Sequence, residues 1–243
     1  MTRYLQLLAG PLAYLLFLAT FLYLIGFIGD LVVPKTVDSG PAAPLAVAVV
    51  IDLALIALFG VQHSVMARPG FKAAWTRVVP LALERTAYVV ASSLALIVLM
   101  ALWRPIPASM WSIAGAGADV LWAVFAIGWG MVLLSTFLIN HFELFGLDQL
   151  WRNARGLPPS PVQFREPLFY RWVRHPLYLG FILAFWAIPR MSAGHLLLAL
   201  GLTVYILIAI RFEERDLTVS IGPPYADYRR RVGMLLPGLG RAR

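Results

Sequence analysis

The sequence predicts an all-α, polytopic integral membrane helical bundle. Hydrophobic residues make up 60% of its 243 residues and charged residues only 13%, which is far from the balance of a soluble domain. The apolar residues gather in long windows, and the breaks between the windows carry Pro, Gly or charged residues. Lys and Arg fall almost entirely in alternate breaks, as expected of a chain that crosses a bilayer repeatedly.

Six apolar windows are expected to form the helices of this bundle. They cover approximately residues 4–29, 45–66, 83–103, 119–144, 177–189 and 195–212. Each of the first four is long enough to cross the roughly 30 Å hydrocarbon core, and no cleavage site follows the first. The fifth is too short for an untilted span, so it is expected to be tilted or partly buried in protein. The prediction is four full spans followed by a C-terminal helical hairpin.

The basic residues predict the orientation of the chain. If the N-terminus is cytoplasmic, all but three of the 20 Lys and Arg residues lie on the cytoplasmic side, the exceptions being Lys35, Arg104 and Arg190. This asymmetry predicts that both termini face the cytoplasm. The same bias accounts for the formal net charge of +8, so a nucleic-acid partner is not expected.

The chain is expected to form a single domain over residues 1–243. It divides into a four-helix membrane half, 1–144, and a hairpin with its tail, 145–243. We find no internal repeat, low-complexity segment or soluble second domain in the sequence. The sequence also has no cysteine, which excludes a disulfide framework, a thiolate metal site and a cysteine nucleophile.

Polar side chains gather at the predicted cytoplasmic ends of the helices. The groups are Gln62-His63-Ser64, Asn140-His141-Phe142-Glu143, Arg174-His175 and Glu213-Glu214. The expected topology brings all four groups to one membrane level. Ionisable residues at such a depth usually have a function or a partner. His195 falls at the opposite turn and is expected to be an interfacial residue with no chemical role.

The segment around Pro176 is typical of a helix start. Pro176 is expected near the first turn, where its missing N–H does no harm. The free N–H groups of that turn and the helix dipole suit a carboxylate or another anion, and Tyr170 and Tyr178 add hydroxyls and aromatic faces. The alternative is an interfacial anchor in which Arg174 meets lipid headgroups.

Glu213 and Glu214 follow an apolar helix directly. Two adjacent carboxylates can bind an ammonium group, a pair of ribose hydroxyls or a cation. The alternative is a solvated helix end in which one of them pairs with Arg211 or Arg215.

These residues form part of an ordered set that resembles the cofactor half of the isoprenylcysteine carboxyl methyltransferase family. The set comprises Tyr170, His175-Pro176-Leu177-Tyr178, Glu213-Glu214, Gly222, Tyr225, Tyr228, Arg229-Arg230-Arg231 and Pro237. The resemblance implies S-adenosylmethionine as cofactor. The residues that it implies for cofactor binding are Tyr170, His175, Pro176, Leu177, Tyr178 and Glu213. The adjacent Glu214 is a further candidate for cofactor binding. Near the position of the family's substrate-side arginine, this sequence has Ala209, and Arg211 is the available arginine.

Upstream segments narrow the resemblance to the bacterial methanethiol S-methyltransferases and the related proteins named after NnrU. The segments are 61–69, 71–72, 75–77, 84–88, 103–105 and 140–147. This likeness implies an enzyme of the bacterial inner membrane that methylates methanethiol to dimethyl sulfide, with a small thiol and membrane lipids as its partners. Three alternatives remain open: a lipid or prenylcysteine methyltransferase, a non-catalytic membrane accessory protein of nitrogen-oxide metabolism, and a small-molecule transporter.

Methyl transfer from a sulfonium to sulfur is an in-line displacement that depends on alignment and requires no metal. A simple alkanethiol should titrate above about 8.5, so a base helps at neutral pH. His141 and Glu143, at the end of the fourth helix, and His63 are the candidate bases. His141 and Glu143 are two residues apart on a helix, so they should point in different directions and not act as one dyad. Four histidines without a repeated ligand spacing argue against a multinuclear metal site.

Overall fold

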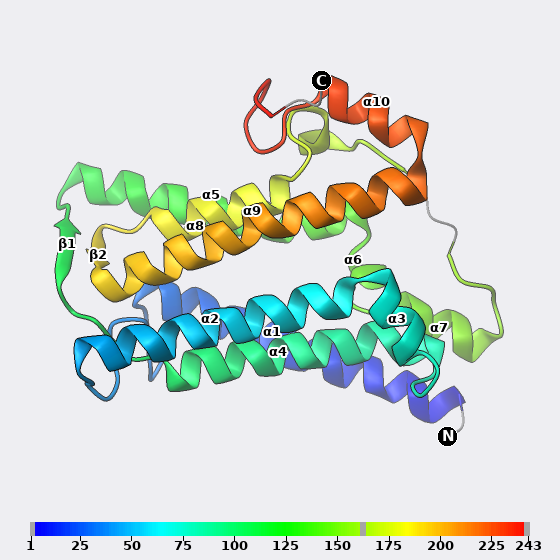
Figure 1. Cartoon of the computed structure of the whole chain (residues 1–243), viewed down its shortest axis with the longest axis horizontal. Helices are drawn as coiled ribbons and strands as arrows, with labels where there is room; N and C mark the ends of the chain where they lie inside the picture. The colour runs from blue at the N-terminus through cyan, green and yellow to red at the C-terminus, as the bar shows by residue number, and fades with distance from the viewer. Residues whose placement is uncertain (1–2, 161–163, 241–243) are drawn as a thin grey trace. The chain divides into compact units, whose positions relative to one another are not determined.

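The computed structural model describes residues 3–160 and 164–240, most of which are helical (Figure 1). The described residues group into two compact units that interleave along the chain. Of the described residues, the first unit draws on 3–110, 141–160 and 192–198, and the second on 111–140, 164–191 and 199–240.

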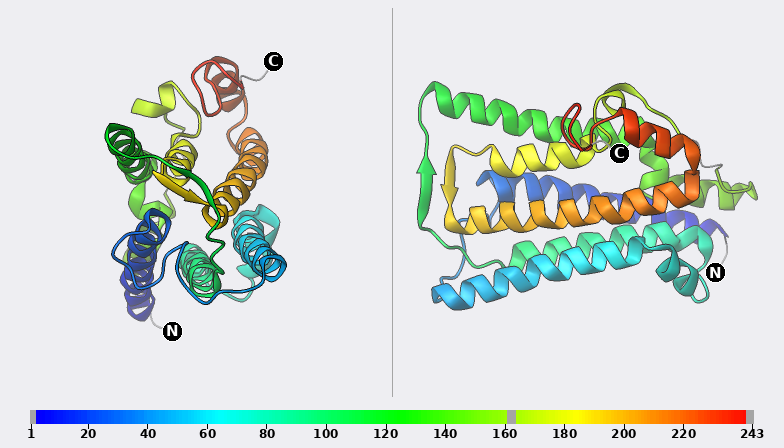
Figure 2. Two further views of the ribbon diagram at one scale, coloured as in Figure 1. Left: turned by 90° about the vertical axis from the view of Figure 1, so that its left-hand side faces the viewer. Right: turned by 45° about the horizontal axis from the view of Figure 1, so that its top comes forward.

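Three long helices form the frame of the first unit: α1 (Arg3–Gly29), α2 (Leu45–Ala67) and α4 (Glu84–Leu102). Both α1 and α2 pack against α4, and the end-on view of Figure 2 shows the three side by side. The buried face of α4 includes Ser92, Ser93 and Ala95. Small side chains such as these let helices approach closely, which favours association of membrane helices.

Shorter helices complete the first unit. Helix α3 (Pro69–Trp75) and the 3-10 turn η1 (Leu81–Leu83) connect α2 to α4. Later in the sequence the chain adds α6 (His141–Leu144) and α7 (Leu147–Arg155) to this unit, and α7 packs against α1. The unit therefore combines N-terminal helices with a segment that follows the fourth predicted span.

Polar side chains form hydrogen bonds at the C-terminal end of α4. The Lys35 ammonium donates to the carbonyls of Ala101 and Trp103, at 2.6 and 2.9 Å. Burial and the nearby Arg104 charge lower the pKa of Lys35. The Asp52 carboxylate, which is fully buried, accepts the backbone N–H of Arg104 at 2.8 Å. Last-turn carbonyls have no intrahelical donor, so the contacts of Lys35 stabilise the helix end.

The second unit is built on α5 (Ala116–Ile139), α8 (Pro176–Trp186) and the part of α9 (Ala193–Ile221) that begins at residue 199. Trp186 of α8 donates from its indole Nε1 to the Thr203 hydroxyl of α9 at 3.0 Å. The 3-10 turn η2 (Leu168–Arg171) precedes α8 and helix α10 (Pro223–Arg231) follows α9. Two short strands, β1 (Ser109–Ser112) and β2 (Arg190–Ser192), pair with each other.

Helices α5 and α8 lie side by side (Figure 1) because each presents a glycine to the other. A Cβ at Gly128 would lie 2.7 Å from the Gly180 carbonyl oxygen and 2.8 Å from the Ala184 nitrogen. A Cβ at Gly180 would lie 2.7 Å from the Gly128 carbonyl oxygen. The backbones meet where only hydrogen atoms fit between them. Such packing accounts for the burial of the short helix α8.

We expect Gly128→Ala to destabilise the protein by about 1–3 kcal/mol, because the added methyl group would force backbone atoms apart. Gly130→Ala is the matched control on the same helix, since a Cβ there meets nothing within 4 Å. Alanine at position 130 should be neutral or slightly stabilising through helix propensity. Thermal unfolding in detergent checks both variants, and equal melting temperatures would contradict this account of the α5–α8 contact.

The prediction of an all-α integral membrane protein is confirmed, with one change in the number of spans. Five helices of the described chain are long and apolar enough to cross a membrane. They are Gln6–Gly29, Leu45–Ala67, Leu81–Leu102, Ala116–Ile139 and Ala193–Ile221. The expected count of four full spans was therefore one too low, because the last apolar window belongs to a 29-residue helix. The fifth window forms the short helix α8, as its length predicted.

Candidate functional site

The C-terminal tail lies against the segment that leads into α8. Val173 and Gly233 form a parallel bridge. The N–H of Arg174 donates to the Gly233 carbonyl at 2.8 Å, and the N–H of His175 donates to the Met234 carbonyl at 3.2 Å. These two N–H groups are thus taken by the protein. An anion at this helix start could be received only by the N–H groups of the turn after Pro176.

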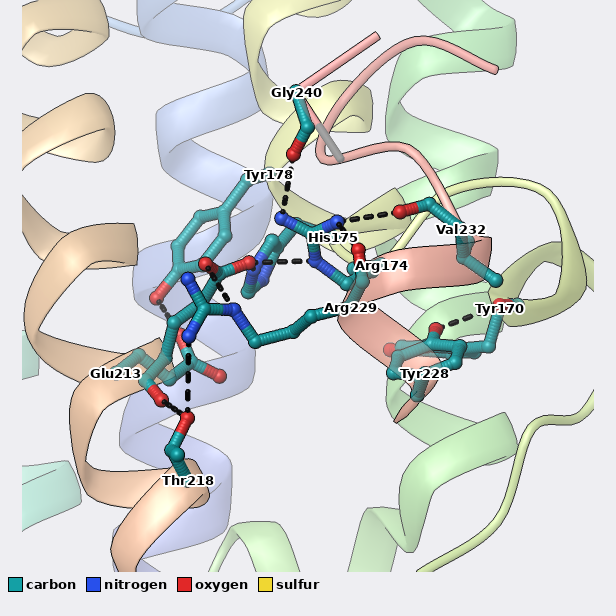
Figure 3. A network of polar contacts seen from close by, with 11 residues as sticks. Tyr170, Arg174, His175, Tyr178, Glu213, Thr218, Tyr228, Arg229, Val232 and Gly240 are labelled. Carbon is teal, nitrogen blue, oxygen red and sulfur yellow. Dashed lines mark hydrogen bonds and ion pairs between the residues drawn. The ribbon is translucent and has the colours of Figure 1, made fainter. Parts of the chain in front are cut away.

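Arg174 holds this tail in place with its whole guanidinium (Figure 3). Its Nη1 donates to the carbonyls of Val232 and Arg229, at 2.5 and 3.2 Å, and its Nη2 donates to the Gly240 carbonyl at 3.0 Å. The residue is only 4% exposed. The interpretation of Arg174 as a headgroup-facing anchor is therefore wrong, because a buried side chain with these partners cannot reach lipid.

Glu214 is the acidic centre of the same network. One carboxylate oxygen, Oε1, accepts Nε of Arg174 at 2.7 Å and Nε2 of His175 at 3.1 Å. The other oxygen lies 3.2 Å from Nε of Arg229. Glu214 is buried, so these partners compensate a charge that would otherwise be costly. The expected alternative of a solvated helix end paired with Arg211 or Arg215 does not apply to Glu214.

Glu213 faces a different set of neighbours although it is adjacent in sequence. The Tyr178 hydroxyl donates to its Oε2 at 2.8 Å, as Figure 3 shows. Among the described residues, Glu213 makes no other hydrogen bond or ion pair. It is half-buried, so one carboxylate oxygen remains for a ligand. Of the two adjacent acids, Glu213 is therefore the one whose charge is not neutralised by an ion pair with the described residues.

Tyr170, Tyr225 and Tyr228 belong to the same unit as this carboxylate. Burial, and then the charge of Glu213, raise the pKa of the Tyr170 hydroxyl well above its usual value. Tyr170 is therefore a protonated hydrogen-bond donor at neutral pH. The Tyr228 hydroxyl donates to the Tyr170 carbonyl at 2.6 Å and fixes its backbone. Tyr225 and Tyr228 are themselves buried, with Phe164 packed against them.

The candidate base His141 belongs to the first unit. The backbone leaves helical geometry at Asn140, with φ 176° and ψ 90°. His141 and Glu143 therefore sit on the separate helix α6, and their expected place at the end of a span over 119–144 is corrected. The Tyr14 hydroxyl lies 2.8 Å from His141 Nε2. His141 is 4% exposed and burial lowers its pKa, so its imidazole is neutral at pH 7.

The other two candidate bases also lie in the first unit. His63 on α2 has both ring nitrogens engaged, with Nε2 at 2.7 Å from the Tyr88 hydroxyl and Nδ1 at 3.0 Å from the Ser92 hydroxyl. Glu143 is half-buried, and its backbone carbonyl accepts the Gln149 amide at 3.0 Å. Among the described residues, no group of three His, Asp or Glu side chains is arranged to hold a metal ion.

His195, which the sequence places at the far turn, is buried in the protein. It is 1% exposed, and its backbone N–H donates to the Ser192 hydroxyl at 3.0 Å. That hydroxyl in turn donates to Asp38. The turn is therefore a buried hydrogen-bonded junction within the first unit.

Sequence reasoning missed the partners that orient the candidate residues. Tyr14, which lies beside His141, is one of several aromatics in an apolar span, and nothing in the sequence separates it from the others. Arg229 was interpreted only as part of a basic tail, yet it pairs with Glu214. The run Arg229-Arg230-Arg231 offered a weak signal, because three successive residues on a helix must face three directions.

Comparisons with known proteins give one consistent result. A family model described as NnrU protein matches residues 52–236. The chain is 56% identical to a Mycobacterium tuberculosis protein named methanethiol S-methyltransferase, over 98% of each chain. It is 51% identical to methanethiol S-methyltransferase 2 of Bradyrhizobium diazoefficiens, over 96% of this chain and 90% of that one. It is also 32% identical to nurim of Pan troglodytes, over 74% of this chain and 70% of nurim. No solved structure matches it.

Proposed function

Since the chain belongs to the NnrU family, we propose that it transfers a methyl group from S-adenosylmethionine to methanethiol and so forms dimethyl sulfide. The observation that carries this proposal is its full-length likeness to proteins that bear the name of that activity. The proposal places the protein in a bacterial inner membrane with both termini in the cytoplasm. Its methyl acceptor is a small thiol that needs no large binding domain.

The side chains around Glu213 fit the polar groups of S-adenosylmethionine. The carboxylate can bind the ammonium group or a pair of ribose hydroxyls through the oxygen that Tyr178 does not occupy. The protonated hydroxyl of Tyr170 can donate to a further acceptor. His175, Pro176 and Leu177 complete the proposed site at the start of α8. When bound, the cofactor supplies an electrophilic methyl group on its sulfonium.

The roles of this chain's own residues follow from their contacts. Tyr178 orients the Glu213 carboxylate, while Glu214 and Arg174 hold His175 and the tail in position. His141 is neutral and can accept the proton of the thiol S–H bond, which leaves a thiolate as methyl acceptor. The Tyr14 hydroxyl orients the imidazole. His63, whose ring nitrogens lie beside the hydroxyls of Tyr88 and Ser92, is the second candidate for the base.

Headspace gas chromatography tests the reaction directly. Purified protein supplied with methanethiol and S-adenosylmethionine should release dimethyl sulfide, and omission of either should abolish the signal. If the folded protein binds the cofactor calorimetrically but methylates only a prenylcysteine or a lipid, the thiol assignment is wrong. If it binds no cofactor at millimolar concentration, the enzyme proposal itself is overturned and a non-catalytic role takes its place.

Glu213→Gln is expected to weaken S-adenosylmethionine binding about 10- to 150-fold, since a lost charge-assisted hydrogen bond costs about 1.5–3 kcal/mol. Asp227→Asn is the matched control, because it removes a carboxylate of the same unit whose ion pair with Arg230 is exposed. Calorimetric titration of both variants measures the effect. Equal affinities in Glu213→Gln, Asp227→Asn and wild type would remove Glu213 from the cofactor site.

A further inference from the structure

A recess in the second unit lies on the side of α9 that faces away from Glu213. Its volume is about 340 Å³. The residues that line it are Arg211, Glu214, Arg215, Thr218, Val219 and Arg229. Successive helical residues are about 100° apart, so Arg211, Arg215 and Thr218 share one face while Glu213 lies about 200° from both arginines. The recess is therefore distinct from the proposed cofactor contact at Glu213.

The recess carries positive charge that the protein does not compensate. Glu214 and Arg229 pair with each other, and Arg174 also contacts Glu214. Among the described residues, Arg211 and Arg215 make no hydrogen bond or ion pair, and both are exposed. Two neighbouring guanidinium groups without a carboxylate partner repel each other. An anion placed between them would remove that repulsion and accept charge-assisted hydrogen bonds.

The position of Arg211 along α9 indicates the headgroup layer of the membrane. The helix has 29 residues and is therefore about 43 Å long, which exceeds the roughly 30 Å hydrocarbon core. From residue 196 the helix is uncharged up to Ile210, and Arg211 is the first charged side chain. The recess begins at this change from apolar to charged residues.

An exposed apolar stripe runs along α9 directly to the two arginines. Leu200, Val204 and Ile208 are 46%, 54% and 48% exposed. They are spaced by four residues, and Arg211 and Arg215 continue the same helical face. A phospholipid has this order of chemistry, because its acyl chains are joined through glycerol to a phosphate headgroup. A free anion would use the arginines but not the stripe.

We propose that Arg211 and Arg215 bind the phosphate of a phospholipid headgroup whose acyl chain lies along Leu200, Val204 and Ile208. The lipid would hold the charged end of α9, which also carries Glu214, at the membrane surface. Guanidinium groups suit this role because their planar donors match phosphate oxygens in pairs.

Titration of the full-length protein in an uncharged detergent tests the proposal, with binding followed by native mass spectrometry. The probes are dioctanoyl phosphatidylglycerol, dioctanoylglycerol without a phosphate, and inorganic phosphate. We expect the phospholipid to bind more tightly than either of the others. The double variant Arg211→Gln with Arg215→Gln should weaken its binding about 10- to 100-fold, because two charge-assisted contacts are lost.

Arg77→Gln with Arg190→Gln is the matched control, since it removes the same charge from exposed positions outside the recess. Its phospholipid binding should equal that of wild type. If both double variants bound the phospholipid equally weakly, the loss of affinity would come from net charge alone, and the proposed site would be wrong. Equal affinity of wild type for dioctanoylglycerol or for inorganic phosphate would also overturn it. The wild-type titrations test the phospholipid site even if the double variant folds poorly. Arg215→Lys keeps the positive charge but loses the planar guanidinium, so it should bind the phospholipid with intermediate affinity.

Discussion

His141→Ala is expected to lower the turnover of methanethiol about 10²- to 10⁴-fold, the usual range for loss of a general base. Its affinity for S-adenosylmethionine should change little, because the proposed cofactor contacts belong to other residues. The deficit should shrink as the pH rises from about 7 to 10, since solution then supplies thiolate and the base is no longer needed. Initial rates of dimethyl sulfide formation across this pH range measure the effect.

The lowered pKa of His141 also predicts how stability and turnover change at acidic pH. Burial lowers the pKa of the folded state below the unfolded value of about 6.5, so the native protein binds fewer protons than the unfolded chain just below that pH. The wild type should therefore lose stability as the pH falls below about 6.5, and His141→Ala should weaken that dependence. Wild-type turnover, in contrast, should persist to pH values below 6.5, because the folded imidazole stays neutral there.

Two further variants separate catalysis from packing. Tyr14→Phe removes only the hydroxyl beside His141 Nε2, so it should reduce turnover less than His141→Ala does. Because the imidazole remains, its turnover should depend on pH as that of the wild type does. His63→Ala removes the imidazole that contacts the hydroxyls of Tyr88 and Ser92 and should chiefly reduce stability, by about 1–3 kcal/mol. A small deficit in His141→Ala that stays constant with pH would contradict the base assignment.

Most of the helices could be predicted from the sequence because membrane insertion depends on composition and length. The two boundary errors have physical causes. Helix α9 continues to Ile221 after its apolar window ends, because backbone hydrogen bonds do not require apolar side chains once the helix leaves the hydrocarbon. The fourth span ends at Ile139 because the backbone turns at Asn140, although apolar residues continue beyond it.

The residues of the candidate site were predictable, but their division of roles was not. Glu213 and Glu214 are identical side chains that differ by one position, which turns them about 100° apart on the helix. One meets Tyr178 and the other meets Arg174, His175 and Arg229. Only tertiary contacts create this difference, so the sequence could identify the pair but not which acid remains for a ligand.

Arg174→Met is expected to destabilise the protein by about 3–5 kcal/mol, the cost of breaking a buried ion pair by removal of one partner. The variant would also leave the carbonyls of Arg229, Val232 and Gly240 without their donor. The C-terminal tail should then detach from the start of α8. Thermal unfolding measures the loss, and limited proteolysis should cleave the tail in the variant at protease concentrations that leave wild type intact.

Arg171→Met is the matched control, three residues away. The Arg171 guanidinium is exposed and donates to one carbonyl, that of Glu166, at 3.3 Å, so its loss should cost less than about 1 kcal/mol. Arg174→Lys restores the charge but offers a point charge in place of a planar fork, so it should recover only part of the stability. If Arg174→Met were no less stable than Arg171→Met, Arg174 would not be what fastens the tail. Because His175 shares its Glu214 oxygen with Arg174, loss of the fork should also loosen the imidazole, and cofactor affinity should fall together with stability.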